Sequence, residues 1–117
     1  MKISDSEMEL MRIIWKKEGE VTSSELADKL GVVWRPTTIS TFLKRLSDKG
    51  VLNTRKEGKT GYYSAAITEE DYKREQTREF MEEIHSGSVG SLFAALCDSK
   101  ELDKAKLDEL KQWFEEI

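Results

Sequence analysis

The sequence has very little of the chemistry that metal sites, disulfides and nucleophilic active sites require. Its 117 residues include one cysteine, Cys97, and one histidine, His85. One cysteine cannot form an internal disulfide, and a structural zinc site needs about four ligands. An acid, a base and a nucleophile cannot be assembled around these two residues. We therefore expect no enzyme activity, no metal and no cofactor.

Long apolar runs are also missing. No stretch reaches the roughly 18 apolar residues that indicate a membrane-spanning helix. The N-terminal segment MKISDSEMEL carries charges early and lacks the apolar run of a signal peptide. These absences favour a cytoplasmic protein with one domain, or one compact lobe with an appendage, that folds around its own core.

Positive charge is scarce overall but concentrated in one region. The net charge is −4, yet residues 1–65 carry a net charge of +3 and residues 66–117 one of −7. Residues 35–59 alone contain 7 Lys and Arg against 2 Asp and Glu, a net charge of +5. The asymmetry indicates different roles for the two halves, and the local excess favours nucleic-acid binding by the first.

Capping signals begin two helices in the basic half. Residues 4–7 (SDSE) and 22–25 (TSSE) both have the spacing of a capping box, in which Ser or Thr precedes Glu by three positions. The first helix is expected to end near Gly19 and the second at Gly31, because glycine readily adopts the left-handed conformation that ends helices.

A third helix, over residues 36–49, carries the most informative pattern. The only proline, Pro36, suits the first position of a helix. Four apolar residues recur at the spacing i, i+3, i+4 and i+7, which forms one helix face; they are Ile39, Phe42, Leu43 and Leu46. The opposite face holds small hydroxyls and two adjacent cations: Thr37, Thr38, Ser40, Thr41, Lys44 and Arg45.

A β-hairpin is expected next. Residues 51–55 and 62–66 are β-prone, and KEGKTG (56–61) between them has two glycines that allow a turn. Three helices followed by a hairpin, with a short turn between the second and third helices, are typical of a winged helix-turn-helix. We predict a mainly α fold with a small β-hairpin, organised as a winged-helix domain over residues 1–66 and a helical region over residues 67–117.

The polar face of the third helix suits the DNA major groove. In a helix-turn-helix the second helix of the pair lies there, where hydroxyls and arginine can bond to bases or phosphates. Lys44 and Arg45 diverge by about 100° around the helix. We expect Arg45 to reach bases and Lys44 a phosphate. On the hairpin, Arg55, Lys56 and Lys59 are placed for the phosphate backbone.

An alternative interpretation is a winged-helix protein–protein interaction module, because a polar helix face is often only a solvated face. This alternative predicts that reversing the charges of Lys44 and Arg45 leaves function intact. The net charge of +5 over residues 35–59 favours DNA binding instead.

The acidic half is expected to form short amphipathic helices. Their apolar stripes lie within residues 72–84, 89–96 and 107–117. Such helices cannot easily enclose their own apolar faces, so they need a partner surface, either the first lobe or a second copy of the chain.

Four segments together resemble the penicillinase repressor family of bacterial transcription regulators, the BlaI/MecI/CopY group. They are the run from Glu7 to Trp15, TTISTFLKRLSDKGVL (37–52), GYYSAAITEEDY (61–72) and SLFAALCDSKELDKAKLDELKQWFEEI (91–117). Their order and spacing are specific in combination, and the resemblance covers essentially the whole chain.

The resemblance implies a homodimeric repressor of transcription that binds double-stranded DNA at a palindromic operator with TACA and TGTA arms. The family's DNA-facing positions fall on Thr38, Ser40, Thr41 and Arg45, and Ser40 departs from the arginine often found there in penicillinase repressors. Residues 67–117 are then the dimerisation region, with contacts expected from Phe80, Leu92, Phe93, Leu96, Leu107, Leu110 and Trp113.

The resemblance leaves the inducer open. In the β-lactam-responsive members a protease pathway cuts the repressor at an Asn-Phe bond, and the matching position here is Ala95-Leu96, so that signal is not preserved. The copper-responsive members use C-terminal Cys-x-Cys motifs, and this sequence has only Cys97. The alternatives are an inducing protease that acts near Ala95-Leu96 on a different sequence, and a signal of another kind.

Overall fold

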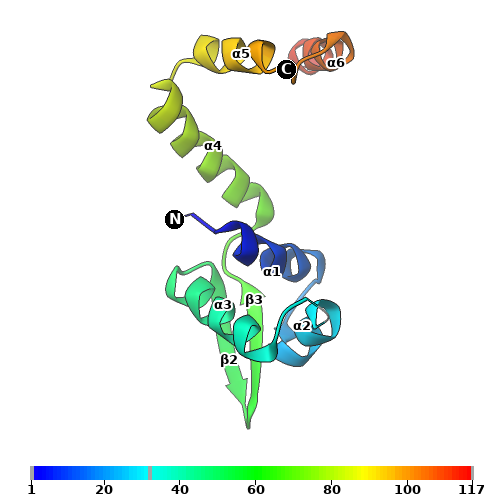
Figure 1. Ribbon diagram of the computed structural model, residues 1–117, viewed down its shortest axis with the longest axis vertical. Coiled ribbons are helices and arrows are strands. Elements are labelled where there is room, and N and C mark those ends of the chain that lie inside the picture. Colours follow the sequence, from blue (N-terminus) through cyan, green and yellow to red (C-terminus); the bar gives the residue numbers. More distant parts are fainter. Residues whose placement is uncertain (1, 32, 117) are drawn as a thin grey trace. The chain divides into compact units, whose positions relative to one another are not determined.

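A computed structural model describes residues 2–31 and 33–116 (Figure 1). The chain divides into two compact units, Met1–Lys73 and Arg74–Ile117. Within the described residues, no helix has both the length and the apolar character needed to cross a membrane.

The described residues of the N-terminal unit form three complete helices, the start of a fourth and a three-stranded antiparallel sheet. The predicted mainly α fold with a small hairpin is confirmed. In the sheet the strand order is β1-β3-β2 (Figure 1). The hairpin of β2 and β3, which we call the wing, projects from the helices. The bounds are α1 Asp5–Lys16, β1 Val21–Thr22, α2 Ser23–Leu30, α3 Pro36–Asp48, β2 Leu52–Glu57 and β3 Thr60–Ala65.

Both predicted capping boxes are present. The Ser4 hydroxyl accepts from the Glu7 backbone N–H while the Glu7 carboxylate accepts from the Ser4 N–H, and Thr22 and Glu25 form the same reciprocal pair at α2. Two backbone donors at the start of each helix are thereby satisfied. α1 ends at Lys16, somewhat before the expected end near Gly19, since Lys17 already has extended backbone angles.

The sheet differs from the predicted hairpin in two respects. β1 was not predicted, because Thr22 is also the N-cap of α2 and Val21 directly precedes it. β1 pairs with Tyr62 and Tyr63 of β3. The hairpin strands are also longer than predicted, so the turn contains only Gly58 and Lys59 instead of residues 56–61. Gly58 has a φ of 62°, which permits this tight reversal.

The inner face of α3 is anchored in the core of the N-terminal unit. Ile39, Leu43 and Leu46 are buried, as the spacing predicted. Phe42 is half-buried at the edge of the core, where its ring packs against Trp34 at a centroid distance of 5.1 Å. Other buried side chains come from all parts of the unit: Ile3, Leu10, Met11, Ile14, Val21, Leu26, Val51, Leu52 and Tyr72. This packing holds the opposite face of α3 outward.

The first turn of α4 (Glu69–His85) packs with the N-terminal unit, which therefore extends beyond the predicted boundary at residue 66. Tyr72 is buried, and its ring lies 5.8 Å from that of Trp15. Its hydroxyl accepts a hydrogen bond of 2.8 Å from the backbone N–H of Ile3. These contacts join the N-terminal arm, α1 and the start of α4.

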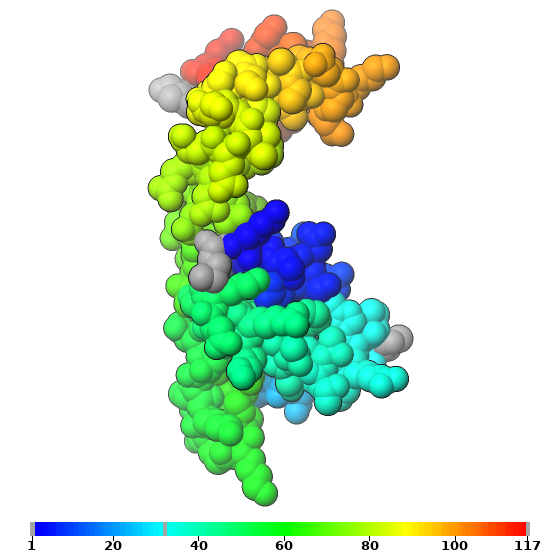
Figure 2. Space-filling model, turned by 60° about the vertical axis from the view of Figure 1, so that its left-hand side comes forward, coloured from blue at the N-terminus to red at the C-terminus, as the bar shows by residue number. Residues whose placement is uncertain are grey.

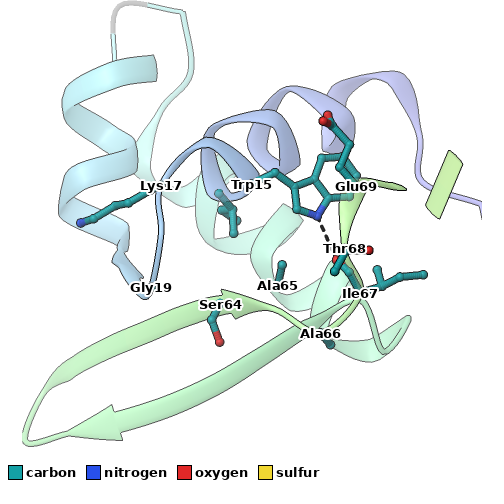
Figure 3. A pocket seen from close by; sticks show the side chains of 10 residues that line it. Trp15, Lys17, Gly19, Ser64, Ala65, Ala66, Ile67, Thr68 and Glu69 are labelled. Atoms are coloured by element: carbon teal, nitrogen blue, oxygen red, sulfur yellow. Dashed lines mark hydrogen bonds between the residues drawn. The ribbon is translucent and has the colours of Figure 1, made fainter. Parts of the chain in front are cut away.

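Trp15 makes a hydrogen bond in the same region whose contribution to stability can be tested. Its indole N–H donates to the backbone carbonyl of Ile67 at 2.9 Å, beside the cleft shown in Figure 3. Trp15→Phe removes this donor, and we expect the free energy of unfolding to fall by about 1 kcal/mol in urea denaturation. Trp34→Phe is the control, because the Trp34 indole has no hydrogen bond to the described residues. If both variants lost the same free energy of unfolding, the hydrogen bond of Trp15 would not be the cause of the loss.

The C-terminal unit comprises the rest of α4, α5 (Val89–Asp98) and α6 (Lys104–Glu116). His85, at the end of α4, is buried and lies 2.8 Å from the Ser91 hydroxyl of α5, while Phe80 packs edge-on against its ring. No hydrophobic side chain among the described residues of this unit is buried. Its large exposed apolar residues are Phe80, Ile84, Val89, Leu107, Trp113 and Phe114.

Candidate nucleic-acid interface

The outward face of α3 carries the hydroxyls and cations that the sequence placed there. Thr37, Ser40, Thr41, Lys44 and Arg45 are exposed, and Thr38 is half-buried. The hydroxyl of Thr41 donates to the carbonyl of Thr37 at 2.9 Å, so its oxygen lone pairs stay available to accept a bond from a ligand. The face is therefore an array of small polar groups on a helix held from behind by its apolar side.

A groove of about 340 Å³ separates α3 from the wing. Lys44 lines it from the helix and Lys56 from β2, and neither has a carboxylate partner among the described residues. The tip of the wing extends beyond the helices of this unit (Figure 2). Lys59 lies in the turn between β2 and β3, which forms this tip. The full lining is Ser40, Lys44, Ser47, Thr54, Arg55, Lys56, Gly61 and Tyr63. A polyanion that enters this groove meets two unneutralised cations and several hydroxyls.

The two adjacent cations of α3 diverge. Lys44 borders the groove, whereas the guanidinium carbon of Arg45 lies 5.5 Å from the centroid of the Phe42 ring. Phe42 is at the edge of the core, so it supports Arg45 on the other flank of the helix. One helix therefore presents a cation toward the wing and another away from it.

The wing has two different faces, because successive side chains of a strand point to opposite sides. On one face, Thr54 pairs with Tyr63 and Lys56 with Gly61. Tyr63 packs against the helical core, so this face is directed toward the helices. On the other face, Arg55 pairs directly with Tyr62. Arg55 and Lys56, which are neighbours in the sequence, therefore lie on opposite sides of the sheet.

Arg55 is already engaged by carboxylates. Its Nε and Nη2 donate to the two oxygens of Glu20 at 3.0 and 2.8 Å, and Nη1 donates to Glu57 at 2.9 Å. The guanidinium also lies over Tyr62, at 4.3 Å from the ring centroid. The hydrogen bonds from Arg55 lower the pKa of the Glu20 carboxyl below its usual value. Glu20 was not predicted as a functional residue, because its partner is distant in the sequence.

The predicted dimer residues all lie in the C-terminal unit, and none is buried. Phe80, Leu107 and Trp113 are exposed, with Trp113 at 62%. The sequence did not single out Ile84, Val89 and Phe114 for this role, although their apolar spacing was a usable signal. The other four predicted residues are half-buried: Leu92, Phe93, Leu96 and Leu110.

The described residues contain no group of three or more His, Cys, Asp or Glu side chains that could hold a metal. Cys97 is exposed on α5, whereas His85 is buried against Ser91.

The exposed second helix of a helix-turn-helix beside a basic hairpin defines the winged-helix class of DNA-binding domains. The sequence matches the family described as penicillinase repressor over residues 3–116, and the chain belongs to this family. The predicted resemblance is thereby confirmed. The family consists of transcriptional regulators and not enzymes, as predicted.

Known proteins resemble both the sequence and the N-terminal fold. The penicillinase repressor of Bacillus licheniformis is 34% identical over 117 residues, which cover 98% of this chain and 91% of that protein. A solution structure of the DNA-binding domain of the repressor BlaI is 42% identical, with a TM-score of 0.55, and covers 61% of this chain and 88% of its own. The structure of monomeric Bacillus licheniformis BlaI in complex with the blaP half-operator is also 42% identical, with a TM-score of 0.52, and covers 62% and 89%.

Proposed function

We propose that this protein is a transcriptional repressor that binds a palindromic operator as a homodimer, with α3 in the major groove and the wing on the phosphate backbone. The observation that carries the proposal is the groove between α3 and the wing, which is bordered by two lysines, Lys44 and Lys56, that have no carboxylate partner among the described residues. The similar BlaI structure is a complex with a half-operator, which supports operator DNA as the ligand of this chain. A cytoplasmic location follows from this function, because bacterial operators lie there.

The two flanks of α3 have different roles in this proposal. Arg45 pairs with the edge of a base, since arginine can donate two hydrogen bonds to guanine. Thr37, Thr38 and Thr41 lie at the N-terminal end of α3, where recognition helices contact bases. Lys44 borders the groove and so binds a phosphate, together with the lysines of the wing, Lys56 and Lys59. Ser40 also lines the groove, so its hydroxyl is placed for the backbone.

Dimerisation is assigned to the C-terminal unit. Its described residues bury no hydrophobic side chain, although Phe80, Trp113 and Phe114 are each 46% exposed or more. A second copy of the chain would cover these side chains, and a two-fold dimer matches the symmetry of an operator with TACA and TGTA arms. Occupancy of such an operator would block transcription of the downstream genes.

Proteolytic release near Ala95-Leu96 stays a prediction. Both residues lie inside α5, with Ala95 exposed and Leu96 half-buried. A protease that binds its substrate in an extended conformation would first have to unfold this part of the helix.

Titration of the intact protein against a labelled palindromic TACA/TGTA duplex and a scrambled duplex, at two salt concentrations, tests the proposed function. We expect tight binding to the palindrome only. Arg45→Ala should cost about 1–3 kcal/mol of discrimination per half-site, because a base contact is lost. Lys44→Ala should weaken binding to every sequence and reduce the salt dependence by about one unit of slope per half-site.

Lys16→Ala on α1 is the control, because it removes one positive charge outside α3 and the wing. Equal, weak binding of the wild-type protein to both duplexes would reject sequence-specific recognition. In that case the interaction module would become the better interpretation, provided that charge reversal at Lys44 and Arg45 also leaves function intact.

A further inference from the structure

We infer that Arg55 is a positioning residue that braces the wing against the helix-turn-helix, and that it does not bind the DNA phosphate backbone. This inference rests on the proposed DNA-binding function and assigns a different role to a residue whose charge and place in the wing suggest a phosphate contact. The brace consists of Arg55, Glu20, Glu57 and Tyr62.

The first argument is the direction of the side chain. Arg55 and its cross-strand partner Tyr62 lie on the face of the sheet opposite Tyr63, which packs against the helical core. The neighbouring Lys56 lies on the face toward the helices, where it lines the groove with Lys44. Arg55 also contributes to the lining of the groove, but its guanidinium lies over the ring of Tyr62 on the opposite face of the wing. DNA that occupies the groove therefore meets the ammonium of Lys56 and not the guanidinium of Arg55.

The second argument is the span of the contact. Glu20 directly precedes β1, and β3 lies between β1 and β2 in the sheet. The side chain of Arg55 therefore crosses the middle strand, over the ring of Tyr62, to reach the carboxylate of Glu20. Two parallel N–H···O bonds of 3.0 and 2.8 Å join the guanidinium to that carboxylate. Bidentate pairs of this kind fix orientation as well as distance.

The third argument is what the contact connects. Thr22, the last residue of β1, is also the N-cap of α2. A tie from β2 to the residue before β1 therefore holds the wing at a set angle to the helix-turn-helix. One guanidinium faces two carboxylates, and three of its N–H groups are committed to them. Such a cluster carries no surplus positive charge to attract a phosphate.

Glu20→Gln in the intact protein distinguishes the two roles by the sign of its effect. If Arg55 is a brace, Glu20→Gln removes one of its charged partners. Binding to the palindromic duplex should then weaken by about threefold per half-site, hence about tenfold for the dimer. As a phosphate contact, Arg55 would be released from a competing carboxylate, so binding should tighten. Glu18→Gln is the matched control, since it removes the same charge from an exposed residue nearby.

Arg55→Lys and Arg55→Gln provide a second, independent readout. Lysine keeps the charge but lacks the planar fork, so a brace predicts that both variants weaken binding and leave the salt dependence unchanged. A phosphate contact predicts that Arg55→Gln lowers the slope by about one unit per half-site and that Arg55→Lys largely retains binding. The Glu20→Gln/Arg55→Gln double variant should bind as weakly as either single variant, because both remove the same contact.

Tighter binding by Glu20→Gln, a reduced slope in Arg55→Gln, or unchanged binding in both variants would overturn the brace. Circular dichroism spectra and melting temperatures of the variants show whether each remains folded, and Arg55→Lys serves where Arg55→Gln does not fold. If the wild-type protein failed to prefer the palindrome over the scrambled duplex, the proposed function itself would fail. If instead the wild-type protein preferred the palindrome and the brace variants bound it equally well, only the proposed role of Arg55 would fail.

Discussion

Trp113→Glu in the intact protein is expected to weaken binding to a palindromic operator by about 100-fold or more and to leave binding to a single half-site unchanged. Trp113 lies on α6 and is 62% exposed, within a unit whose described residues bury no hydrophobic side chain. A carboxylate at this position would lose its contact with water in the proposed dimer interface. The free-energy cost of this desolvation would shift the equilibrium toward the monomer. In a dimer, binding of one subunit to its half-site holds the other subunit close to the second half-site, and a monomer lacks this advantage.

The two duplexes separate this effect from damage to the DNA-binding unit. Gln112→Glu is the matched control, because residue 112 lies on the side of α6 opposite the apolar stripe of Leu107, Leu110 and Trp113. It adds the same charge and should change neither the oligomeric state nor the affinity for the palindrome. Sedimentation velocity reports the dimer directly. A Trp113→Glu protein that stays dimeric, or that binds the palindrome as tightly as the wild type, would reject this interface.

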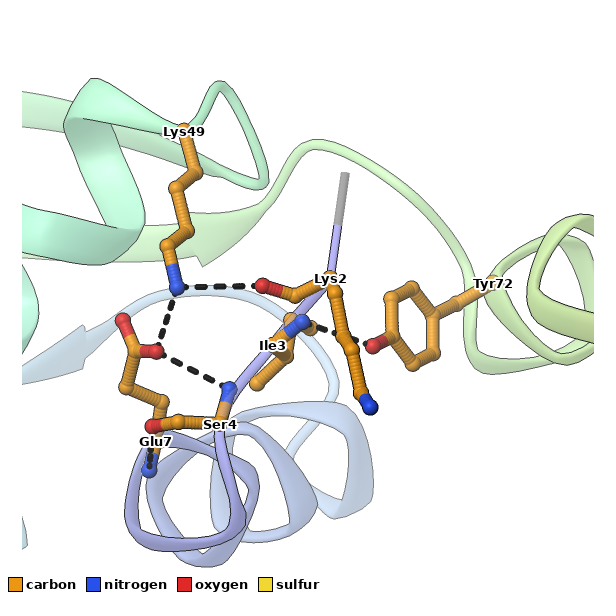
Figure 4. A network of polar contacts seen from close by, with 6 residues as sticks. All are labelled: Lys2, Ile3, Ser4, Glu7, Lys49 and Tyr72. Carbon is orange, nitrogen blue, oxygen red and sulfur yellow. Dashed lines mark hydrogen bonds and ion pairs between the residues drawn. The ribbon is translucent and has the colours of Figure 1, made fainter. Parts of the chain in front are cut away.

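Lys49→Met is expected to lower the free energy of unfolding by about 2–3 kcal/mol, since it removes the cation beside a buried carboxylate. Glu7 is only 1% exposed, and one of its oxygens accepts bonds from the Lys49 ammonium at 2.5 Å and from the Ser4 N–H at 2.9 Å (Figure 4). Its other oxygen, Oε2, is buried without a hydrogen-bond partner among the described residues. Lys49 also donates to the carbonyl of Lys2 at 3.0 Å.

The pH dependence of this loss has a definite sign. Burial raises the pKa of the Glu7 carboxyl, but the hydrogen bonds from Lys49 and Ser4 outweigh it and hold the pKa below its usual value. A carboxyl with a lowered pKa contributes stability above its unfolded pKa of about 4.3, and the contribution is lost as the pH falls through the folded pKa. The difference between Lys49→Met and the wild type should therefore be largest near neutral pH and shrink in acid.

Urea denaturation of both proteins at neutral and acidic pH measures this difference. Lys29→Met, on the exposed surface of α2, is the control and should change stability by less than about 0.5 kcal/mol. A loss for Lys49→Met that is equally small, or that grows as the pH falls, would contradict the proposed role of the pair. The pair also joins the start of α1 to the end of α3, so its loss should loosen the helix proposed to bind DNA.

The sequence by itself determined the helices whose start and buried face are set by residues close together in the chain. Both capping boxes lie within four consecutive residues, and Pro36 starts α3 without any help from distant contacts. The apolar spacing within α3 also decided which of its faces is buried, because helix geometry relates residues three and four positions apart. The cationic outer face of α3 followed directly from that assignment.

Only the tertiary structure decided the features that join distant segments. β1 has two residues and becomes a strand only by pairing with β3, which no local pattern indicates. Arg55 and Glu20 are 35 positions apart, and Glu7 and Lys49 are 42 apart. In the sequence, Arg55 and Lys56 are equivalent cations in a basic hairpin. They differ because successive side chains of β2 point to opposite faces of the sheet. The side chain of Lys56 is directed toward the groove and that of Arg55 toward two carboxylates, which is a consequence of strand pairing and not of residue type.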